Sequence, residues 1–136
     1  GSAPVQISDF APLIVVRDVA TSVDFYRRLG FHPAIQWPTY AKLTAGAKVL
    51  HLASPGDPPP DRPDLALRAP EGTSPTVTAA LVLQVEDCRR ACADLVAAGI
   101  ALLTTPAAPA WGGEVRAFVR DPDGHLIEIN EVTSPT

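Results

Sequence analysis

A single carboxylate lies inside an apolar segment near the end of the chain. Glu128 stands between Ile127 and Ile129, where an ionised side chain is costly unless it has a partner. Three roles would explain it: a metal ligand, an acid that contacts a ligand, or a solvated residue on the outer face of a half-buried strand. Because side chains alternate along a strand, Glu128 shares a face with Leu126 and Asn130. That face either points to solvent or forms the wall of a cleft.

His51 is the second residue whose type could do chemistry. It stands between Leu50 and Leu52 in the segment KVLHLAS. A histidine with a pKa near neutrality can act as a general base. A lone histidine on an apolar strand is more often a hydrogen-bonded polar residue than a ligand or a base, and the pattern therefore favours no catalytic role.

The segment WGGEVRAFVRDPDGHLIEIN, at 111–130, gathers several polar and aromatic residues. Glu114, Arg116 and Phe118 occupy alternate positions and would share one face of a strand. If this face points inward, the cleft contains an acid, a base and an aromatic ring. Trp111 precedes two glycines that indicate a turn, which favours a place at the rim of a cleft over the alternative of packing in the core.

Two more aromatic residues stand at a similar boundary in the first half. Trp37 and Tyr40 flank Pro38, at the point where one strand-like run ends and the next begins. We expect the rim of a cleft near strand ends, where aromatic residues stand beside prolines and glycines.

The elements that must position these residues are encoded twice. Residues 11–31 and 79–100 both read as an apolar strand that ends at an aspartate, an amphipathic helix and a closing glycine. Asp18 corresponds to Asp87, and each is a candidate N-cap. Gly30 corresponds to Gly99, and each suits the left-handed residue that ends many helices. We therefore expect two copies of one structural unit.

Three strand-like runs follow each predicted helix, and the DPDG sequence indicates a tight turn between the last two. The runs lie at 31–37, 40–45 and 47–53 and at 100–105, 114–120 and 125–132. The sequence predicts an α+β fold of two βαβββ modules in tandem, with curved mixed sheets that enclose a cleft. A single domain over 3–136 would contain module one (8–54), a proline-rich connector (55–76) and module two (77–133). The connector is too rich in proline for a helix or a central strand, and it could act as a flap over the cleft.

The predicted helices each carry an apolar stripe that should face a sheet. The first consists of Val23, Phe25, Tyr26 and Leu29, and the second of Ala91, Leu95, Val96 and Ala98. Cys88 and Cys92 also lie in the second helix. Two cysteines at this spacing indicate neither a disulfide framework nor a zinc site, and we expect both to be small residues on the helix face.

Composition excludes several classes of protein. The net charge of −4 argues against nucleic acid, whose phosphates require a basic surface. No apolar run approaches the roughly 20 residues of a membrane span, and no signal peptide is recognised. The leading Gly1-Ser2 resembles the remnant of a cleaved tag. We expect a cytoplasmic protein with reduced cysteines and no membrane or nucleic-acid partner.

The whole pattern resembles the vicinal oxygen chelate superfamily, which contains glyoxalase I, extradiol dioxygenases, fosfomycin-resistance enzymes and bleomycin-resistance proteins. The segments LIVVRDVATSVDFYRRLGF at 13–31 and WGGEVRAFVRDPDGHLIEIN at 111–130 carry the resemblance. It covers nearly the whole chain except the connector. One such fold hosts many chemistries. The resemblance implies that the strand faces that carry His51 and Glu128 line the cleft.

The metal ligands of the superfamily are incomplete in this chain. Its enzymes usually hold a divalent metal with one side chain from the first strand and one from the last strand of each half. The first-strand positions fall at about Ala11 and Ala80, which carry no donor, whereas the last-strand positions fall at His51 and Glu128. Two protein ligands are fewer than the three usual even in an open catalytic site. Because this chain lacks two of the four metal ligands of the superfamily, we expect no metal and no cofactor, as in bleomycin-resistance-like members.

The resemblance therefore implies a metal-independent protein that binds a flat natural-product antibiotic, confers resistance by sequestration and works as a homodimer with two clefts between subunits. In drug-binding members an aromatic residue at the cleft mouth stacks on the ligand, and Trp111 fits that position. No catalytic residue is expected. The predicted ligand-binding residues are Trp111, Trp37, Tyr40, His51, Glu114, Arg116, Phe118 and Glu128.

The alternative is a glyoxalase- or dioxygenase-like enzyme of the same fold. One form would hold a metal through His51 and Glu128 with water and substrate oxygens. The other would use one of these two residues for acid–base catalysis without a metal, and burial in an apolar site would suit a carboxylate to that role.

Overall fold

The first module forms the first of two four-stranded sheets. The computed structural model describes residues 3–57, 61 and 64–134. Strand β1 (Leu13–Val15) leads into helix α1 (Val19–Leu29), and three strands follow, β2 (His32–Trp37), β3 (Tyr40–Ala45) and β4 (Lys48–Ala53). The strand order is β1-β4-β3-β2, with β1 parallel to β4 and the remaining pairs antiparallel.

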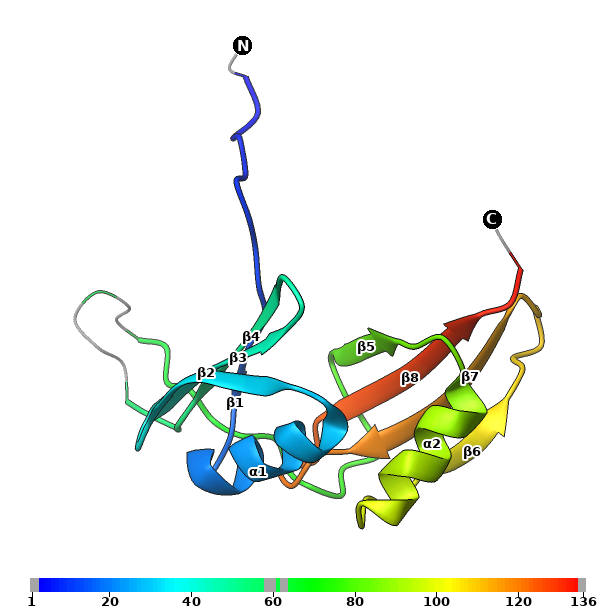
Figure 1. Ribbon diagram of the computed structural model, residues 1–136. Coiled ribbons are helices and arrows are strands. Elements are labelled where there is room, and N and C mark those ends of the chain that lie inside the picture. Colours follow the sequence, from blue (N-terminus) through cyan, green and yellow to red (C-terminus); the bar gives the residue numbers. More distant parts are fainter. Residues whose placement is uncertain (1–2, 58–60, 62–63, 135–136) are drawn as a thin grey trace.

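The second module repeats this arrangement. Strand β5 (Ala80–Gln84) and helix α2 (Cys88–Ala97) precede β6 (Thr104–Ala107), β7 (Glu114–Arg120) and β8 (Leu126–Val132). The order β5-β8-β7-β6 again has one parallel and two antiparallel pairs. Figure 1 shows the two sheets side by side with both helices on the same side. The predicted α+β fold of two tandem βαβββ modules is confirmed.

Helix α1 forms as the apolar periodicity predicts. Val23, Phe25 and Tyr26 are buried, and Leu29 is packed against the core. Gly30 ends the helix in the left-handed conformation, with its N–H bonded to the carbonyls of the last turn. Asp18 occupies the N-cap position, but its carboxylate accepts from the Thr21 hydroxyl and caps no backbone amide, so that part of the prediction is wrong.

Helix α2 turns only part of its predicted apolar stripe inward: Leu95 is buried and Ala91 packs against the core. Asp87 caps it by accepting from the Arg90 amide, as predicted. The buried face, however, consists of Cys88, Cys92 and Leu95, whereas Val96 is 56% exposed. The Cys88 thiol donates to a main-chain carbonyl of β8, and burial raises its pKa to about 11. Small cysteines let the helix approach the sheet closely, and both thiols are free.

The predicted strand over 100–105 is also wrong in its bounds. Ile100 is 4% exposed and packs into the core while the chain crosses from α2 to the sheet edge. Strand β6 begins only at Thr104, and its pairing with β7 is interrupted before Ala107. Pro106, which has no amide to donate, lies in this interruption.

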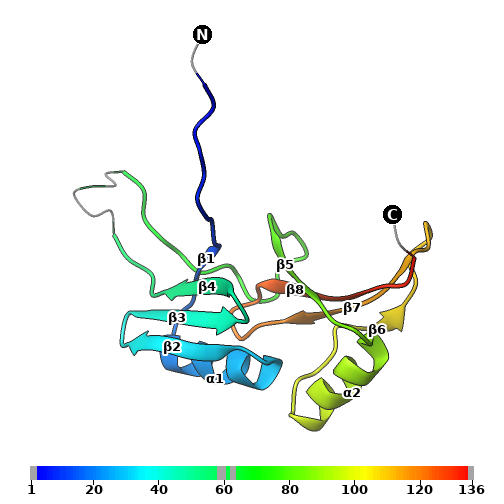
Figure 2. The same cartoon turned by 45° about the horizontal axis from the view of Figure 1, so that its top comes forward.

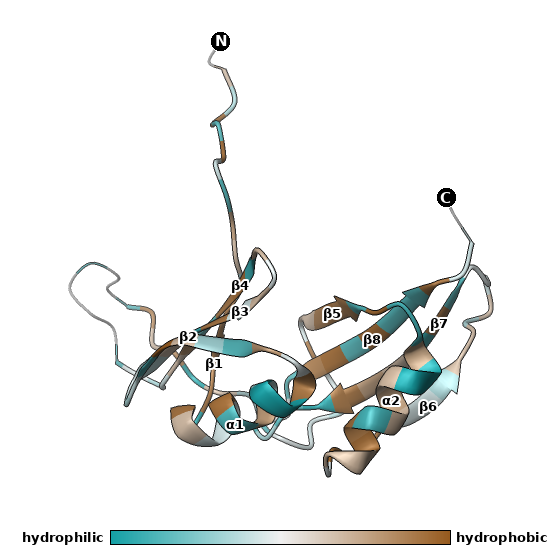
Figure 3. Cartoon of the chain, viewed as in Figure 1, coloured by the Kyte–Doolittle hydropathy of each residue, from teal (hydrophilic) through white to brown (hydrophobic). Residues whose placement is uncertain are grey.

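Each sheet has one face covered by its helix and one face free of it. Buried residues alternate with half-buried ones along β7, and along β8 as far as Ile129. Figure 3 shows hydrophobic and hydrophilic bands along β8. Val115, Ala117 and Val119 point toward α2 together with Ile127 and Ile129. The opposite, free face of the second sheet therefore carries the polar residues singled out from the sequence.

The turn between β7 and β8 joins the two modules. The buried Tyr26 hydroxyl on α1 donates to Asp121 Oδ2 over 2.8 Å, and this burial and contact raise the pKa of Tyr26. Asp123 Oδ1 accepts from the Arg17 amide at 2.9 Å and from its guanidinium at 3.1 Å. His125 Nε2 lies 2.7 Å from the carbonyl of Val15. The DPDG turn is thus an intermodule joint as well as a hairpin turn.

The last part of the connector, residues 70–74, lies against this joint. Arg120 donates to the Ser74 carbonyl over 2.8 Å, and the Arg17 guanidinium contacts the Pro70 carbonyl. Arg120 shares the free face of the second sheet, so the connector covers one end of that face. Residues 58–60 and 62–63 of the predicted connector lie outside the described residues. None of the helices in the described part of the chain is long and apolar enough to cross a membrane.

Candidate functional site

The free face of the second sheet brings together four of the predicted site residues. Glu114, Arg116 and Phe118 lie on β7, and the register places Phe118 opposite Glu128 and Arg116 opposite Asn130 on β8. These side chains are half-buried, except for the more deeply buried Asn130. The position of Glu128 is therefore that of a residue on a sheltered polar face.

Asn130 connects the two carboxylates of this face. Its amide nitrogen donates to Glu114 Oε1 over 2.6 Å and to Glu128 Oε2 over 2.8 Å. The other oxygen of Glu128 lies 3.5 Å from the Arg116 guanidinium, and the Glu128 side chain is 13% exposed. The cost of sheltering this carboxylate is offset by one ion pair and one hydrogen bond.

Trp111 lies over the same face, held by two contacts. Its indole N–H donates to Glu114 Oε2 over 3.0 Å, and the Arg116 guanidinium lies 4.8 Å from its ring centroid. Arg116 also lies 5.2 Å from the ring of Phe118. These are cation–π contacts, so one guanidinium positions two aromatic rings. The indole nevertheless stays 69% exposed, which excludes the alternative of core packing.

The backbone before β7 explains how Trp111 reaches this position. Gly112 and Gly113 have φ values of 69° and 80°, a region that other residues rarely adopt. The Gly113 carbonyl accepts from the amides of Thr133 and Ser134, which fixes the turn to the end of β8. The two glycines therefore form an ordered turn that sets Trp111 three residues before its partner Glu114.

The contacts of Glu114 lower its pKa below the ordinary value. The hydrogen bond from Trp111 is the main cause, and those from Asn130 and the charge of Arg116 act in the same direction against partial burial. The carboxylate is therefore ionised at neutral pH. With Glu128 and Arg116, two acids and one guanidinium lie beside Trp111 on this face.

The pKa of Glu114 supplies a test of the network. Because the folded-state pKa is depressed, the stabilisation is fully present above the ordinary value of 4.5 and is lost as the pH falls through the folded-state pKa. In the Trp111→Phe variant the pKa of Glu114 should move back toward 4.5. Carboxyl carbon NMR, with Glu114→Gln for assignment, measures both midpoints. An unchanged midpoint in Trp111→Phe would mean that the indole does not hold the carboxylate.

The other predicted residues form a separate aromatic row on the first sheet. The rings of Trp37 and Tyr40 lie 5.6 Å apart, and those of Tyr40 and His51 lie 5.8 Å apart in a stacked arrangement. The Tyr40 hydroxyl is hydrogen-bonded to His51 Nδ1. Lys42 lies opposite His51 on the neighbouring strand. Trp37 is 60% exposed, so this row also presents an aromatic surface.

The two groups of residues do not meet within one chain. Among the residues that the structure describes, no hydrogen bond, ion pair or ring contact joins the row on the first sheet to Trp111 or its partners. Within one chain the eight predicted ligand-binding residues thus form two groups, and their role in binding stays a prediction. Sequence reasoning missed Asn130 as the central donor, although strand alternation placed it on the correct face.

The residues present do not fit the metal that the superfamily usually holds. The register places Leu13 beside His51 and Val82 beside Glu128, and neither carries a donor atom. Ala80 pairs with Leu126 instead, and Ala11 precedes β1. Across the described ranges, no group of three or more histidine, cysteine, aspartate or glutamate side chains could hold a metal. Glu128 is already bonded to Arg116 and Asn130, and the absence of a metal remains a prediction.

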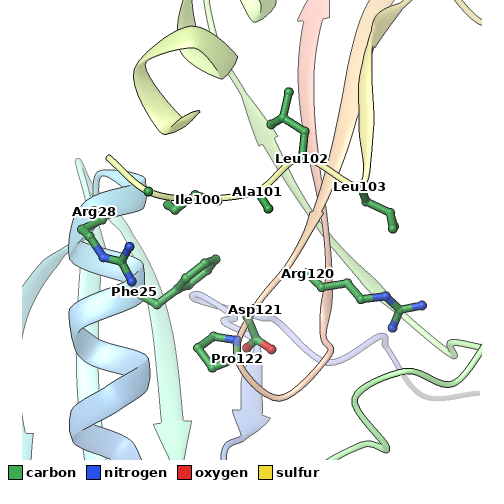
Figure 4. Close-up of a pocket in the computed structure, with 10 residues that line it drawn as sticks. Phe25, Arg28, Ile100, Ala101, Leu102, Leu103, Arg120, Asp121 and Pro122 are labelled. Atoms are coloured by element: carbon green, nitrogen blue, oxygen red, sulfur yellow. The ribbon is translucent and has the colours of Figure 1, made fainter. Parts of the chain in front are cut away.

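A further cavity of about 340 Å³ lies between the two modules on the side of the helices. Figure 4 shows Phe25 and Arg28 of α1 on one side of it and the segment from Ile100 to Leu103 on the other. The Arg28 guanidinium is paired with Asp24 at 3.2 Å and donates to a carbonyl at the end of α2. The lining of this cavity is mainly apolar, and its two cations, Arg28 and Arg120, are already bonded to other groups, so we assign it no ligand.

The chain belongs to the Glyoxalase/Bleomycin resistance protein/Dioxygenase superfamily, whose family pattern matches residues 6–129. This is the class that the paired βαβββ modules and their free sheet faces define. No curated protein matches the chain.

Several solved structures share the fold. A glyoxalase/bleomycin resistance protein/dioxygenase from Nocardioides is 21% identical, with a TM-score of 0.73 over 96% of this chain and 86% of that one. A glyoxalase-related enzyme from Fulvimarina pelagi is 25% identical, with a TM-score of 0.67 over 92% and 88% of the two chains. An integron cassette protein from V. cholerae is 22% identical, with a TM-score of 0.68 over 95% and 98%.

Proposed function

We propose that this protein binds a flat aromatic small molecule of the natural-product antibiotic type and protects by sequestration, as a cytoplasmic homodimer that makes and breaks no bond. The observation that carries the proposal is the Trp111 indole. It is held by Glu114 and Arg116 and yet remains largely exposed. A held aromatic ring offers contact area at low cost in conformational entropy, so Trp111 is suited to stack on a planar ligand.

The charges on this face favour a cationic ligand. Around Trp111, Glu114 and Glu128 supply two negative charges against the one of Arg116, whereas the Arg120 guanidinium lies at the end of the face and donates to the carbonyls of Ser74 and Gly124. Opposite charges attract more strongly near a sheltered surface than in bulk water. The net charge of −4 for the chain acts in the same direction. A planar cation is therefore expected to bind more tightly than a planar anion of the same size.

Calorimetric titration tests the proposal. Planar and peptide antibiotics are titrated first, and the affinity for an aminoacridine cation is then compared with that for an acridine carboxylate. Protection by affinity alone requires dissociation constants from nanomolar to micromolar, roughly −12 to −8 kcal/mol. Loss of the stacking surface in Trp111→Ala should weaken binding by about 10- to 100-fold. Val96→Ala, on the exposed side of α2, is the matched control and should bind as the unaltered protein does. No binding of any planar compound, or equal binding by Trp111→Ala, would remove the proposal.

A second candidate function rests on the pair Tyr40 and His51. The Tyr40 hydroxyl holds His51 Nδ1, which leaves Nε2 as the nitrogen that could exchange a proton with a substrate. The similarity to a glyoxalase-related enzyme supports an enzymatic role for this pair. His51→Ala should then abolish turnover and leave folding intact. Turnover that persists in His51→Ala would exclude this candidate.

A further inference from the structure

Arg116 is the most sheltered of the four arginines that form ion pairs in the described part of the chain, and it is the least bonded. Its side chain is 29% exposed, against 40% for Arg28, 53% for Arg17 and 61% for Arg68. Each of the other three donates to a carboxylate or a carbonyl. In that part of the chain the Arg116 guanidinium makes no hydrogen bond, and its one ion pair, with Glu128, spans 3.5 Å. A guanidinium carries five N–H donors, so hydrogen bonds to the protein do not account for its sheltered position.

Two aromatic rings and a carboxylate surround this guanidinium. Its central carbon lies 4.8 Å from the centroid of the Trp111 ring and 5.2 Å from that of Phe118. Glu128, whose side chain is 13% exposed, supplies the carboxylate. The negative face of an aromatic ring attracts a cation, and proteins bind organic cations with several such rings. We call Trp111, Phe118 and Glu128 the cage, and the Arg116 guanidinium occupies it.

The walls of the cage are held in place by groups other than the guanidinium. The Trp111 indole N–H donates to Glu114 over 3.0 Å, and the Asn130 amide donates to Glu114 and Glu128 over 2.6 Å and 2.8 Å. Phe118 lies within β7, which is paired with a strand on each side. The cage therefore keeps its shape when another cation takes the place of the guanidinium.

The Arg116 side chain can leave the cage toward solvent. It lies on the free face of the second sheet, and Figure 1 and Figure 2 both show α2 on the other side of that sheet. A long arginine stem can stay against the sheet while its charged end turns to water. Because a partly exposed ion pair contributes little to stability, the pair with Glu128 does not lock the guanidinium in place.

We propose that the cage binds a guanidinium or amidinium group of the ligand, and that Arg116 is an internal occupant which this group displaces. A ligand amidinium has the flat shape and the charge of the group that now fills the cage. It can donate to Glu128 Oε1, the oxygen that Asn130 does not use, in a charge-assisted hydrogen bond. A flat ring attached to the amidinium then lies against Trp111. This inference rests on the proposed function, and it names the charged group of the ligand and the side chain that competes with it.

Emptying the cage should raise its affinity for an amidine. In Arg116→Ala the walls remain and the competing charge is gone, so calorimetry should show naphthamidine binding at least about 10-fold tighter than to the unaltered protein. Naphthamide, which has the same shape and no charge, should gain less than about threefold. Arg28→Ala is the matched control, because the Arg28 guanidinium also lies over a ring, 5.9 Å from the centroid of Phe25, but is paired and hydrogen-bonded on the helix side. This control should bind naphthamidine as the unaltered protein does.

The Nε–H resonance of Arg116 reports whether the guanidinium leaves the cage. Without ligand, the rings of Trp111 and Phe118 should shift this resonance upfield from that of a solvated arginine, because the guanidinium lies over both. The loss of the resonance in Arg116→Ala assigns it. Saturating naphthamidine should return it to the ordinary position. A resonance that keeps its shift at saturation would mean that Arg116 stays in the cage, and the inference would be wrong.

Arg116→Lys keeps a positive charge beside the carboxylates and tests the same point should the alanine variant fail to fold. Its compact, strongly hydrated ammonium makes no planar stack on the rings, so naphthamidine should again bind more tightly than to the unaltered protein. Equal or weaker binding of naphthamidine by the folded variants, or no binding by any of them, would overturn the inference. Aminoacridine binding that depends on Trp111 would then leave the proposed function standing. Tighter naphthamidine binding, with no planar antibiotic and no aminoacridine bound, would instead remove only the proposed function.

Discussion

The Asp121→Ala variant is expected to lose about 3–5 kcal/mol of the free energy of unfolding. The carboxylate accepts from the Tyr26 hydroxyl and from the amides of Asp123 and His125. Tyr26 is fully buried and Asp121 is 5% exposed, so water cannot replace the lost acceptor. Each buried donor left without a partner costs about 1–3 kcal/mol. Urea denaturation followed by tryptophan fluorescence measures the difference.

Two companion variants make the Asp121 experiment specific. Tyr26→Phe removes one of the three donors without leaving a new unpaired group on the tyrosine, and should cost about 1 kcal/mol. Asp24→Ala breaks the exposed i,i+4 pair with Arg28 and should stay within about 0.5 kcal/mol of the unaltered protein. If Asp121→Ala were no less stable than Asp24→Ala, the joint would not hold the modules together.

The Gly124→Ala variant should cost about 2–4 kcal/mol, from a clash and an unfavourable backbone together. An added Cβ would lie 2.5 Å from Gly72 Cα and 2.6 Å from its carbonyl oxygen, and the φ of Gly124 is 95°. Both contacts are with backbone, so no side chain can move aside. The connector would have to leave the β7–β8 turn, and the same urea experiment should show the loss.

Gly46→Ala is the control that separates conformation from contact. Gly46 also has a positive φ, of 59°, but a Cβ there would meet nothing within 4 Å. Only the backbone term remains, about 1 kcal/mol. Equal losses of unfolding free energy in Gly46→Ala and Gly124→Ala would show that the contact between the connector and the turn does not stabilise the fold.

Local patterns predicted most of the elements and one face of the site. Period-two alternation placed Glu114, Arg116 and Phe118 together on β7, and the DPDG sequence indicated the turn that the structure contains. These features depend on residues only a few positions apart, so they can be predicted from the sequence. Helix α2 shows the limit: Cys88 and Cys92 face the core in place of Val96, because the space beneath the helix is set by the sheet and not by the hydropathy of the helix.

The repeated βαβββ unit, the strand faces and the lack of donors at the first-strand metal positions can all be predicted from the amino-acid sequence. Which residues contact one another follows from the packing of the fold. The donation from Asn130 to both carboxylates, the guanidinium of Arg116 between two rings and the bond from Tyr26 to Asp121 depend on strand register and module packing. Such contacts join residues far apart in the chain. They are selected by the geometry of the whole fold, because no local propensity distinguishes one distant partner from another.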